Sequence, residues 1–462
     1  MDGGIRPVPR VARERWLDSL VRAGWPAAGD QGTGDRHTGD RNTGDGPGSE
    51  RVAVGEALGR VTAAPVVARW PSPRTDCAAM DGIAVRAADL AAALPVPAEG
   101  QPEDVRADGQ AVRLPAGLFE WIDTGDPMPA SADTVILRER LLPQADGGMV
   151  ITGPSGGQER GQRSGHAASG RNVRTAGEDF GAGQTLVRAG RRLRPGDLAA
   201  AAAGGHVTVS VARRPVVAII PTGDEIRPVG TVPRFGDIID TNSLMLTARC
   251  RQLGAVPVVS PVVPDDPDAL AVELRQAAGQ ADLVLVIAGS SRGRGDHAAA
   301  VLAQVGGVAV AGVAVRPGHP ALLGHAKRPE AGHGRPAEGD AARRTGIAPV
   351  IGLPGYPLAT AVIFELFAVP MLLGLTGQAT ARDLVRARLD RDWSSPADAE
   401  EWVLVTLAPG GAGGVPVATP ARRVASSISQ LARADAWWPI PAGQGAFTSG
   451  TQVEVILVPG GG

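Results

Sequence analysis

The chain has 462 residues, too many for one hydrophobic core, so we expect two to four domains. Its formal net charge is −2, and this balance does not point to a nucleic-acid or membrane partner. The only two cysteines, Cys77 and Cys250, lie far apart, which argues against a disulfide framework or a paired-cysteine metal site. Without a signal-peptide core or an apolar stretch of membrane-spanning length, we expect a soluble, cytoplasmic protein.

The N-terminal segment combines a helix pattern with a low-complexity stretch. Residues 11–25 place Trp16, Leu17 and Leu20 at helical spacing, which predicts an amphipathic helix. Residues 26–50 carry repeated Thr-Gly-Asp units, with no apolar residue between Gly29 and Glu50. A segment of this composition cannot bury apolar surface, so we expect a disordered insert.

Carboxylates recur in turns between residues 70 and 180. Asp81 follows Met80 in the stretch WPSPRTDCAAMDGIAV (70–85), and Thr124 lies in the turn DTGDP (123–127). A carboxylate at a loop tip can serve catalysis or bind a metal, although Asp-Gly is also one of the commonest ordinary turn pairs. Residues 86–150 read as β-rich, residues 153–170 as a polar linker, and Asp179 as part of another exposed turn.

From Pro215 onward, strand and helix patterns alternate. Val216 to Ile220 is an unbroken apolar run, typical of a strand buried on both faces of a parallel sheet. The further predicted strands are VPVVSPVV (256–263), LVLVIAG (283–289), VAVAGVAV (308–315) and PVIGL (349–353). The predicted helices are 242–253, capped by Thr241 or Asn242, then 267–280, 298–306 and a long apolar one after Pro357. Residues 325–347 read as a third low-complexity insert. The pattern predicts a parallel α/β domain.

Five polar loops follow the predicted strands and should meet at one rim of the sheet, because ligands of open α/β sheets bind at the strand ends. The loops are TGDE (222–225), PDD (264–266), SSRGRGD (290–296), RPGHP (316–320) and GLPGYP (352–357). Their backbone N–H groups and hydroxyls suit phosphate or another oxyanion, and their carboxylates can hold a divalent cation. Residues 379–462 then read as a small β domain, with a helical turn at 426–431.

The order of these motifs resembles the molybdopterin molybdenumtransferase family, which includes MoeA-type proteins and the E-domain of gephyrin. The resemblance covers residues 10–458 apart from the inserts. Its motifs are AMDG with a downstream AVR, TGDPMP, GEDFGAGQTLVRAGRRL, PTGDEI, DTNS, DDP, GLPG with the long helix after it, and a Ser-Ser-x-Ser turn near the end. So many motifs in one order make the resemblance highly specific.

The resemblance implies a multidomain α/β protein with four domains that forms elongated homodimers. Domain I would comprise residues 8–70 with 171–211, including the insert 26–50, and would take part in dimerisation. Domain II, a β-rich lid, would span residues 71–170. Domain III would be a parallel-sheet molybdopterin-binding domain (MoCF or MogA-like), residues 212–378 with a flexible insert at 325–347. Domain IV, the small β domain, would span residues 379–462.

The resemblance also implies a reaction. The family inserts molybdenum from molybdate into the dithiolene of adenylylated molybdopterin, with Mg²⁺, and releases AMP. The active site would lie between domain III of one subunit and domain II of the other. A molybdopterin adenylyltransferase would be the upstream partner, and no nucleic acid or membrane would be involved.

Carried over residue by residue, the resemblance assigns three groups of site residues. The catalytic residues would be Asp81, Thr124, Asp179, Glu225 and Asp296. The metal ligands would be Glu225, Asp296 and one of Asp265 and Asp266. The residues that bind the pterin cofactor would be Thr222, Gly223, Asp224, Ser290, Ser291, Gly293, Arg316, Gly318, His319 and Gly355.

Three loops depart from the family pattern. The chain has AGSSRGRGDH where GGVSVGxxDY is usual, RPGHP for KPGKP, and GLPGYP for GLPGNP. His319 therefore replaces a lysine, and an unperturbed histidine is mostly uncharged at neutral pH, which weakens an anion clamp. An alternative function is thus a non-catalytic or specialised paralogue that binds the pterin or a partner enzyme. A scaffolding role is a third possibility, although no clustering segment is visible.

Overall fold

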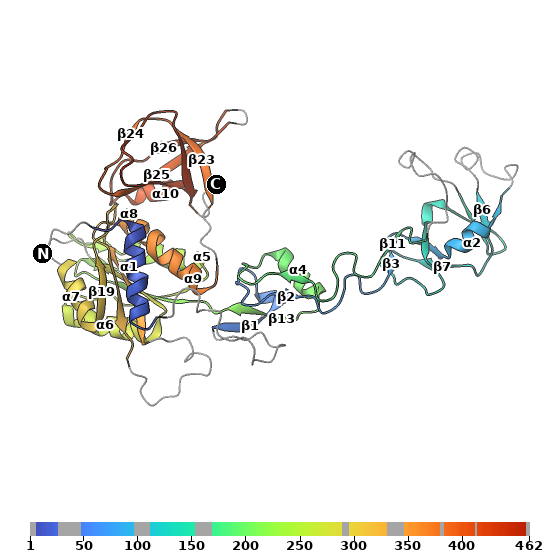
Figure 1. Ribbon diagram of the computed structural model, residues 1–462, viewed down its shortest axis with the longest axis horizontal. Coiled ribbons are helices and arrows are strands. Elements are labelled where there is room, and N and C mark those ends of the chain that lie inside the picture. The colour runs from blue at the N-terminus through green and yellow to red at the C-terminus, as the bar shows by residue number, and fades with distance from the viewer. Residues whose placement is uncertain are drawn as a thin grey trace.

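The computed structural model describes residues 6–25, 48–96, 111–152, 169–288, 295–329, 346–378, 383–411 and 414–458. The chain is elongated (Figure 1): an α/β body and a small β domain lie at one end, and a narrow arm carries further strands away from them. The arm is an insertion between helix α1 (Pro9–Arg22) and the first body strand β14 (Val216–Pro221). Most of the inserts predicted at 26–50 and 325–347, and most of the linker at 153–170, fall outside the described residues.

The body is built on a six-stranded sheet in the order β17-β14-β18-β22-β21-β19. Its strands are β17 (Val256–Val259), β18 (Leu283–Ala288), β22 (Ile347–Pro354), β21 (Leu322–Lys327) and β19 (Gly306–Ala311), in addition to β14. The predicted parallel pairing is confirmed for β17, β14, β18 and β22. Strand β21, which the sequence did not reveal, is antiparallel to both of its neighbours.

The central strands are buried on both faces, as the unbroken apolar runs predict. Val217 and Ile219 of β14 point to one hydrophobic cluster, and Ala218 and Ile220 point to the other. The first cluster also includes residues of α1, α5 (Thr241–Gln252), α8 (Pro357–Ile363) and α9 (Val369–Leu375). The second includes residues of α6 (Pro267–Gln280) and α7 (Gly295–Val305). The sheet is therefore the middle layer of a three-layer body.

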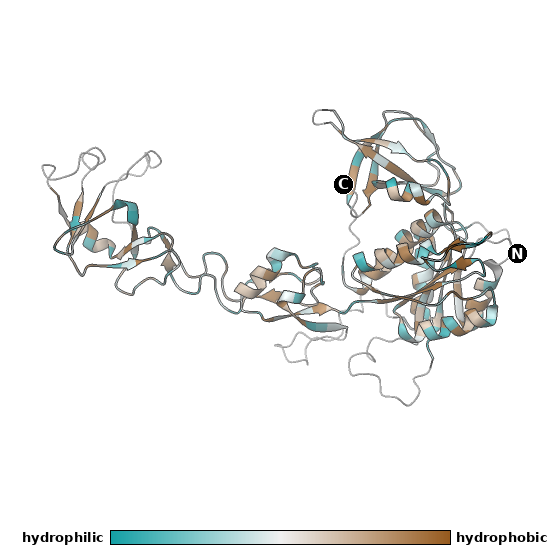
Figure 2. Cartoon of the chain, turned by 180° about the vertical axis from the view of Figure 1, so that it is seen from behind, coloured by the Kyte–Doolittle hydropathy of each residue, from teal (hydrophilic) through white to brown (hydrophobic). Residues whose placement is uncertain are grey.

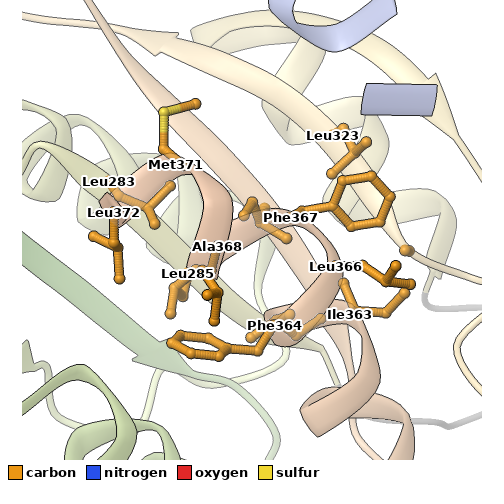
Figure 3. Close-up of a cluster of buried hydrophobic side chains, with 14 of the residues drawn as sticks. Leu283, Leu285, Leu323, Ile363, Phe364, Leu366, Phe367, Ala368, Met371 and Leu372 are labelled. Atoms are coloured by element: carbon orange, nitrogen blue, oxygen red, sulfur yellow. The ribbon is translucent and has the colours of Figure 1, made fainter. Parts of the chain in front are cut away.

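The long apolar helix after Pro357 is a core element. It continues from α8 through a π-helical segment, Phe364–Ala368, into α9. Figure 3 shows Phe364, Phe367 and Leu372 of this helix gathered with Leu283 and Leu285 of β18. Among the described helices it alone has the length and apolarity of a membrane span, but most of it is buried inside the body.

Helix α1 packs on the sheet of the body. The predicted helix at 11–25 is confirmed with slightly earlier bounds. Trp16 is 1% exposed, donates a hydrogen bond from Nε1 to the carbonyl oxygen of Gly324 in β21 (2.8 Å), and meets Phe367 edge to face. A segment near the N-terminus thus belongs to the core of a domain that otherwise begins some two hundred residues later.

Several sequence-based bounds need correction. Asp240, not Thr241 or Asn242, caps α5, because its carboxylate accepts a hydrogen bond from the Ser243 backbone (2.9 Å). The strand predicted at 256–263 ends at Val259, and the one predicted at 308–315 is divided between β19 and β20 (Val315–Arg316). The predicted inserts are too wide, because Ser49 begins a strand and β21 extends to Lys327.

The arm contains two groups of elements. The group near the body pairs β1 with β13 and β2 with β12. Its elements are β1 (Ser49–Ala53), β2 (Val66–Val67), β12 (Thr185–Val187), α4 (Pro195–Ala203) and β13 (Thr208–Ala212). The outer group contains the sheets β7-β4-β8, β5-β6-β10-β9 and β11-β3.

The remaining elements of the arm belong to its outer group. They are β3 (Cys77–Ala78), β4 (Gly82–Val85), α2 (Ala87–Ala92), β5 (Leu94–Pro95), β6 (Val112–Leu114), β7 (Phe119–Ile122), β8 (Thr134–Leu137), β9 (Leu141–Pro143), β10 (Met149–Ile151) and β11 (Val173–Arg174). The prediction that this region is β-rich is confirmed.

The C-terminal residues form the small β domain that their pattern predicts. Its elements are β23 (Leu384–Leu389), β24 (Trp393–Ser394), β25 (Glu400–Ala408), β26 (Val417–Pro420), α10 (Ile428–Arg433), β27 (Ala436–Ile440), β28 (Ala446–Phe447) and β29 (Gln452–Leu457). Strand β20 of the body pairs with β25 and joins the two domains. Apolar residues concentrate in the strands of the body and of this domain (Figure 2).

Candidate functional site

The loop after β14 is held at the rim of the sheet by hydrogen bonds to its neighbours. Thr222 donates from its backbone N–H (3.1 Å) and from Oγ1 (2.9 Å) to the carbonyl oxygen of Ile287 in β18. Gly223 donates to the carbonyl oxygen of Val263 (3.1 Å) and has φ of +132°, a conformation that favours glycine. A Cβ at this position would lie 2.8 Å from Oε2 of Glu225, so the carboxylate of Glu225 folds back over the glycine.

Asp224 and Asp265 connect two of the rim loops. The backbone N–H of Asp224 donates to Oδ2 of Asp265 (3.3 Å), and the backbone N–H of Asp265 donates to Oδ1 of Asp224 (3.2 Å). Both carboxylates are therefore held at one edge of the sheet, where Glu225 follows Asp224 in the chain. Carboxylate oxygens are the donors that Mg²⁺ prefers, and a cation would relieve the repulsion between them.

Asp266 has a different structural role from Asp265. Its Oδ1 accepts hydrogen bonds from the backbone N–H groups of Asp268 (2.7 Å) and Ala269 (3.0 Å), which makes it the N-cap of α6. Of the two candidates that the sequence left open, Asp265 is thus the one that faces the loop after β14.

The third rim loop is only partly described. Asp296 lies in the first turn of α7, whereas Ser290, Ser291 and Gly293 fall outside the described residues. Among the described residues, no group of three or more His, Cys, Asp or Glu side chains is placed to hold a metal ion. Asp224, Glu225 and Asp265 are therefore not, by themselves, arranged as a metal site within the described residues.

The loop between β19 and β21 lies at the same rim, because β19 runs parallel to β22. Arg316 binds Asp398 of the small β domain through Nη2, at 2.8 and 3.1 Å from the two carboxylate oxygens. Gly318 is buried at φ of +122°, where a Cβ would lie 2.8 Å from Ile363. This close approach requires glycine and fixes the path of the loop.

Three basic side chains line a cavity of about 570 Å³ beside this loop. They are Arg6, Arg316 and His319, with Asp398 as the acidic member. Partial burial lowers the pKa of His319, and the positive charges of Arg6 and Arg316 lower it further. His319 is consequently neutral at neutral pH, and the cavity loses one of its three potential cations.

The last rim loop meets the N-terminal end of α5. Asn242 donates from Nδ2 to the carbonyl oxygen of Gly355 (2.7 Å), and Tyr356, half exposed, is the N-cap residue of α8. Asn242 is 8% exposed, and its Oδ1 has no hydrogen-bond partner among the described residues. Arg6, Asn242 and Asp398 were not predicted as site residues; Asn242 lies within the quoted DTNS motif, but Arg6 and Asp398 carry no motif.

Asp81 and Thr124 meet in the outer part of the arm. Oδ1 of Asp81 accepts hydrogen bonds from the Thr124 backbone N–H (2.7 Å) and from Thr124 Oγ1 (2.6 Å). These two bonds, together with the positive charge of Arg138, hold the pKa of Asp81 below its usual value. Asp179, also in the arm, lies in a separate exposed turn, where its backbone N–H donates to the carbonyl oxygen of Ser72 (3.0 Å).

Within one chain these two groups of residues are far apart. The strands that flank Asp81 and Thr124 belong to the outer end of the arm, and the strand-end rim belongs to the body (Figure 1). A single chain therefore carries these two groups of residues at opposite ends.

Comparison with known proteins identifies the chain. Three family models match it in order: the MoeA N-terminal region (domain I and II) over residues 35–205, a probable molybdopterin binding domain over 218–374, and the MoeA C-terminal region (domain IV) over 386–458. A molybdopterin molybdenumtransferase from Nostoc is 30% identical over 433 residues, covering 89% of each protein. The chain belongs to the molybdopterin molybdenumtransferase family.

Other members agree with this assignment. The molybdopterin molybdenumtransferase of Bacillus subtilis is 29% identical over 417 residues, covering 89% of this chain and 90% of that protein. The crystal structure of a molybdopterin biosynthesis MoeA protein from Pyrococcus horikosii aligns with a TM-score of 0.72 at 27% identity, covering 98% of this chain and 99% of that one. The predicted family and fold class are confirmed.

Proposed function

We propose that the chain is a molybdopterin molybdenumtransferase that takes molybdate and adenylylated molybdopterin, requires Mg²⁺, and releases AMP. The observation that carries this proposal is the rim after β14 and β17, where Asp224 and Asp265 are hydrogen-bonded to each other and Glu225 folds back over Gly223. Membership of the family over nearly the whole chain supports it. We expect the reaction to take place in the cytoplasm, downstream of a molybdopterin adenylyltransferase.

The three carboxylates are hard oxygen donors, the kind that Mg²⁺ prefers, on two loops joined by backbone-to-carboxylate hydrogen bonds, but within the described residues they are not placed to hold the ion by themselves. Asp224, Glu225 and Asp265 would hold the ion, with Asp296 as a further ligand. When bound, Mg²⁺ would neutralise charge that develops on the phosphates as AMP departs. Thr222 and Gly223 keep the loop in place, and Arg316 and His319 face the cavity in which an oxyanion would bind.

The separation of these two groups of residues supports a homodimer. Asp81 and Thr124 would complete a partner's rim rather than their own, since they lie at the far end of the arm (Figure 1). Because Asp81 accepts two hydrogen bonds, it would remain ionised and would offer a carboxylate oxygen to a cation or a polar group at the partner's rim.

The direct test mixes purified protein with adenylylated molybdopterin, molybdate and Mg²⁺ and follows AMP release. We expect release that depends on both molybdate and Mg²⁺. Tight pterin binding without any turnover would refute the proposed activity and favour a specialised pterin-binding paralogue. His319 and the half-exposed Tyr356 are the observations that favour that second function.

A complementation experiment tests the shared site. An Asp81→Asn chain and a Glu225→Gln chain are each expected to be inactive, but a mixed dimer contains one site with both native residues. Recovery of about a quarter of wild-type activity after mixing and re-equilibration is expected, because half of the dimers are mixed and each has one intact site. No recovery in dimers shown to have exchanged would contradict the shared site.

A further inference from the structure

A second cavity lies where the arm joins the body. It has a volume of about 220 Å³ and is lined by Arg60, Arg192, Arg214 and Arg251. Arg214 lies two residues before β14, whereas the rim follows the other end of that strand. The cavity is therefore at the opposite edge of the sheet from the site described above, and the proposed function makes no use of it.

The arginines come from both sides of the junction. Arg192, from the arm, donates to the carbonyl oxygens of Gly59 (2.9 Å) and of Leu253 (3.0 Å), the residue that follows α5. Arg251, from the body, lies in the last turn of α5. The backbones also approach closely here, since a Cβ on Gly190 would lie 2.8 Å from the carbonyl oxygen of Gly377. A ligand in this cavity would contact the arm and the body together.

The positive charge of the cavity is only partly compensated. Arg60 is paired with Glu50 and also donates to the carbonyl oxygen of Ala212 (2.9 Å). Burial lowers the pKa of Arg192, and no carboxylate offsets this effect. Arg214 and Arg251 are exposed and, within the described part of the chain, form no ion pair. The carbonyl groups at the end of α5 supply only partial negative charge, and Arg192 already binds one of them.

We propose that this cavity binds a phosphate group, as inorganic phosphate or as a phosphomonoester. Arg192 is partly buried without a carboxylate partner, which is unfavourable for its charge, and a bound anion would offset that cost; the exposed Arg214 and Arg251 line the same cavity. Guanidinium groups present paired N–H donors that match the oxygens of a tetrahedral oxyanion, and the volume accommodates a phosphate with a small attached group. Because the donors come from both domains, the bound anion fixes the angle between arm and body.

The test measures binding of inorganic phosphate to the full-length protein by calorimetry at low ionic strength. We expect one site per chain. The variant Arg214→Gln/Arg251→Gln should bind phosphate about a hundredfold more weakly, since each lost charge-assisted bond contributes about tenfold. Arg275→Gln, an exposed arginine on α6, is the matched control and should bind like the wild type. Arg192→Lys, which keeps the charge but not the paired donors, should give an intermediate affinity.

Several outcomes would overturn the proposal. One is that the double variant binds phosphate as tightly as the wild type, and another is that folded wild-type protein binds none. If phosphate does not bind but the double variant loses self-association, the cavity receives an acidic segment of a second copy instead. A parallel titration with glycerol 3-phosphate separates the two ligand sources, because a phosphomonoester site binds it more tightly than phosphate. None of these readouts depends on AMP release, so the proposed function is tested separately.

Discussion

Thr124 donates two hydrogen bonds to a single oxygen of Asp81, one from its backbone and one from its hydroxyl, across 43 residues of sequence. These bonds connect two turns that look ordinary in the sequence, and they hold the carboxylate of Asp81 at the outer end of the arm. The two hydrogen bonds lower the pKa of Asp81, so this carboxylate stays ionised to lower pH than an isolated aspartate.

Replacing Thr124 by valine should raise the pKa of Asp81, because the hydroxyl bond is lost while the backbone bond remains. Since the native pKa is depressed, the ionised form is lost only as pH falls through that lowered value. The acidic limb of the rate–pH profile should therefore move to higher pH in Thr124→Val and stay in place in Thr124→Ser. Carboxyl NMR titration of Asp81 provides a direct check, and identical titration curves for the three proteins would contradict this account.

Asp265→Asn should weaken Mg²⁺ binding by at least about tenfold, because it removes a charged donor beside Asp224. Calorimetric titration with Mg²⁺ alone measures this without turnover. Asp266→Asn is the matched control, since asparagine caps helices as well as aspartate does. It should bind Mg²⁺ normally and keep the stability of α6. Equal losses in both variants would mean that the adjacent carboxylates share the metal.

Asp266→Ala should lower the free energy of unfolding by about 1 kcal/mol, because α6 loses the side chain that accepts from its first N–H groups. Urea unfolding compared with the wild type gives the value. An unchanged midpoint would show that water replaces the cap at no cost.

His319→Lys should strengthen oxyanion binding at pH 7.5 by about tenfold, since a permanent charge replaces a ring that is neutral there. In the wild type, affinity should rise as pH falls through the lowered pKa of His319, so the difference between the two proteins should narrow toward pH 5.5. Binding of molybdate by calorimetry at both pH values measures the effect. His319→Gln should bind weakly at both, and a pH dependence that survives in this variant would exclude His319 as its source.

Trp16→Ala should destabilise the body by about 3–5 kcal/mol, the usual cost of removing a large buried aromatic side chain. The loss of the hydrogen bond to Gly324 contributes to this value. Arg15→Ala, on the exposed side of α1, should stay within about 0.5 kcal/mol of the wild type. A small effect of Trp16→Ala in urea unfolding would mean that α1 is not part of the body's core.

The sequence predicted best those elements that are determined by local signals. The helix at 267–280 has the predicted bounds, because Pro267 marks its first turn and an apolar run follows closely after its end. The capping of α5 was assigned to the wrong residue, since Asp240, Thr241 and Asn242 all carry side chains that can cap. Strand β21 was missed because its last residues were grouped with the polar insert that follows it.

The candidate site could be predicted only in part from the sequence, for a similar reason. Each carboxylate was visible as a member of a turn, but the pairing of Asp224 with Asp265 and of Asp81 with Thr124 depends on contacts between distant segments. Arg6 and Asp398 lie beside the rim without any motif around them, so only the fold brings them there. Likewise, the different roles of Asp265 and Asp266 could be assigned only once the first turn of α6 was located.

The docking of α1 has a consequence for how the chain is made. Trp16 and its acceptor Gly324 are 308 residues apart, so the ribosome releases the helix long before its binding surface on β19 and β21 exists. During that interval the apolar stripe of Ala12, Trp16 and Leu20 is exposed on the nascent chain, while the arm can already fold. The core of the body is complete only after α8 and α9 have been translated, because their side chains belong to the same cluster as Trp16.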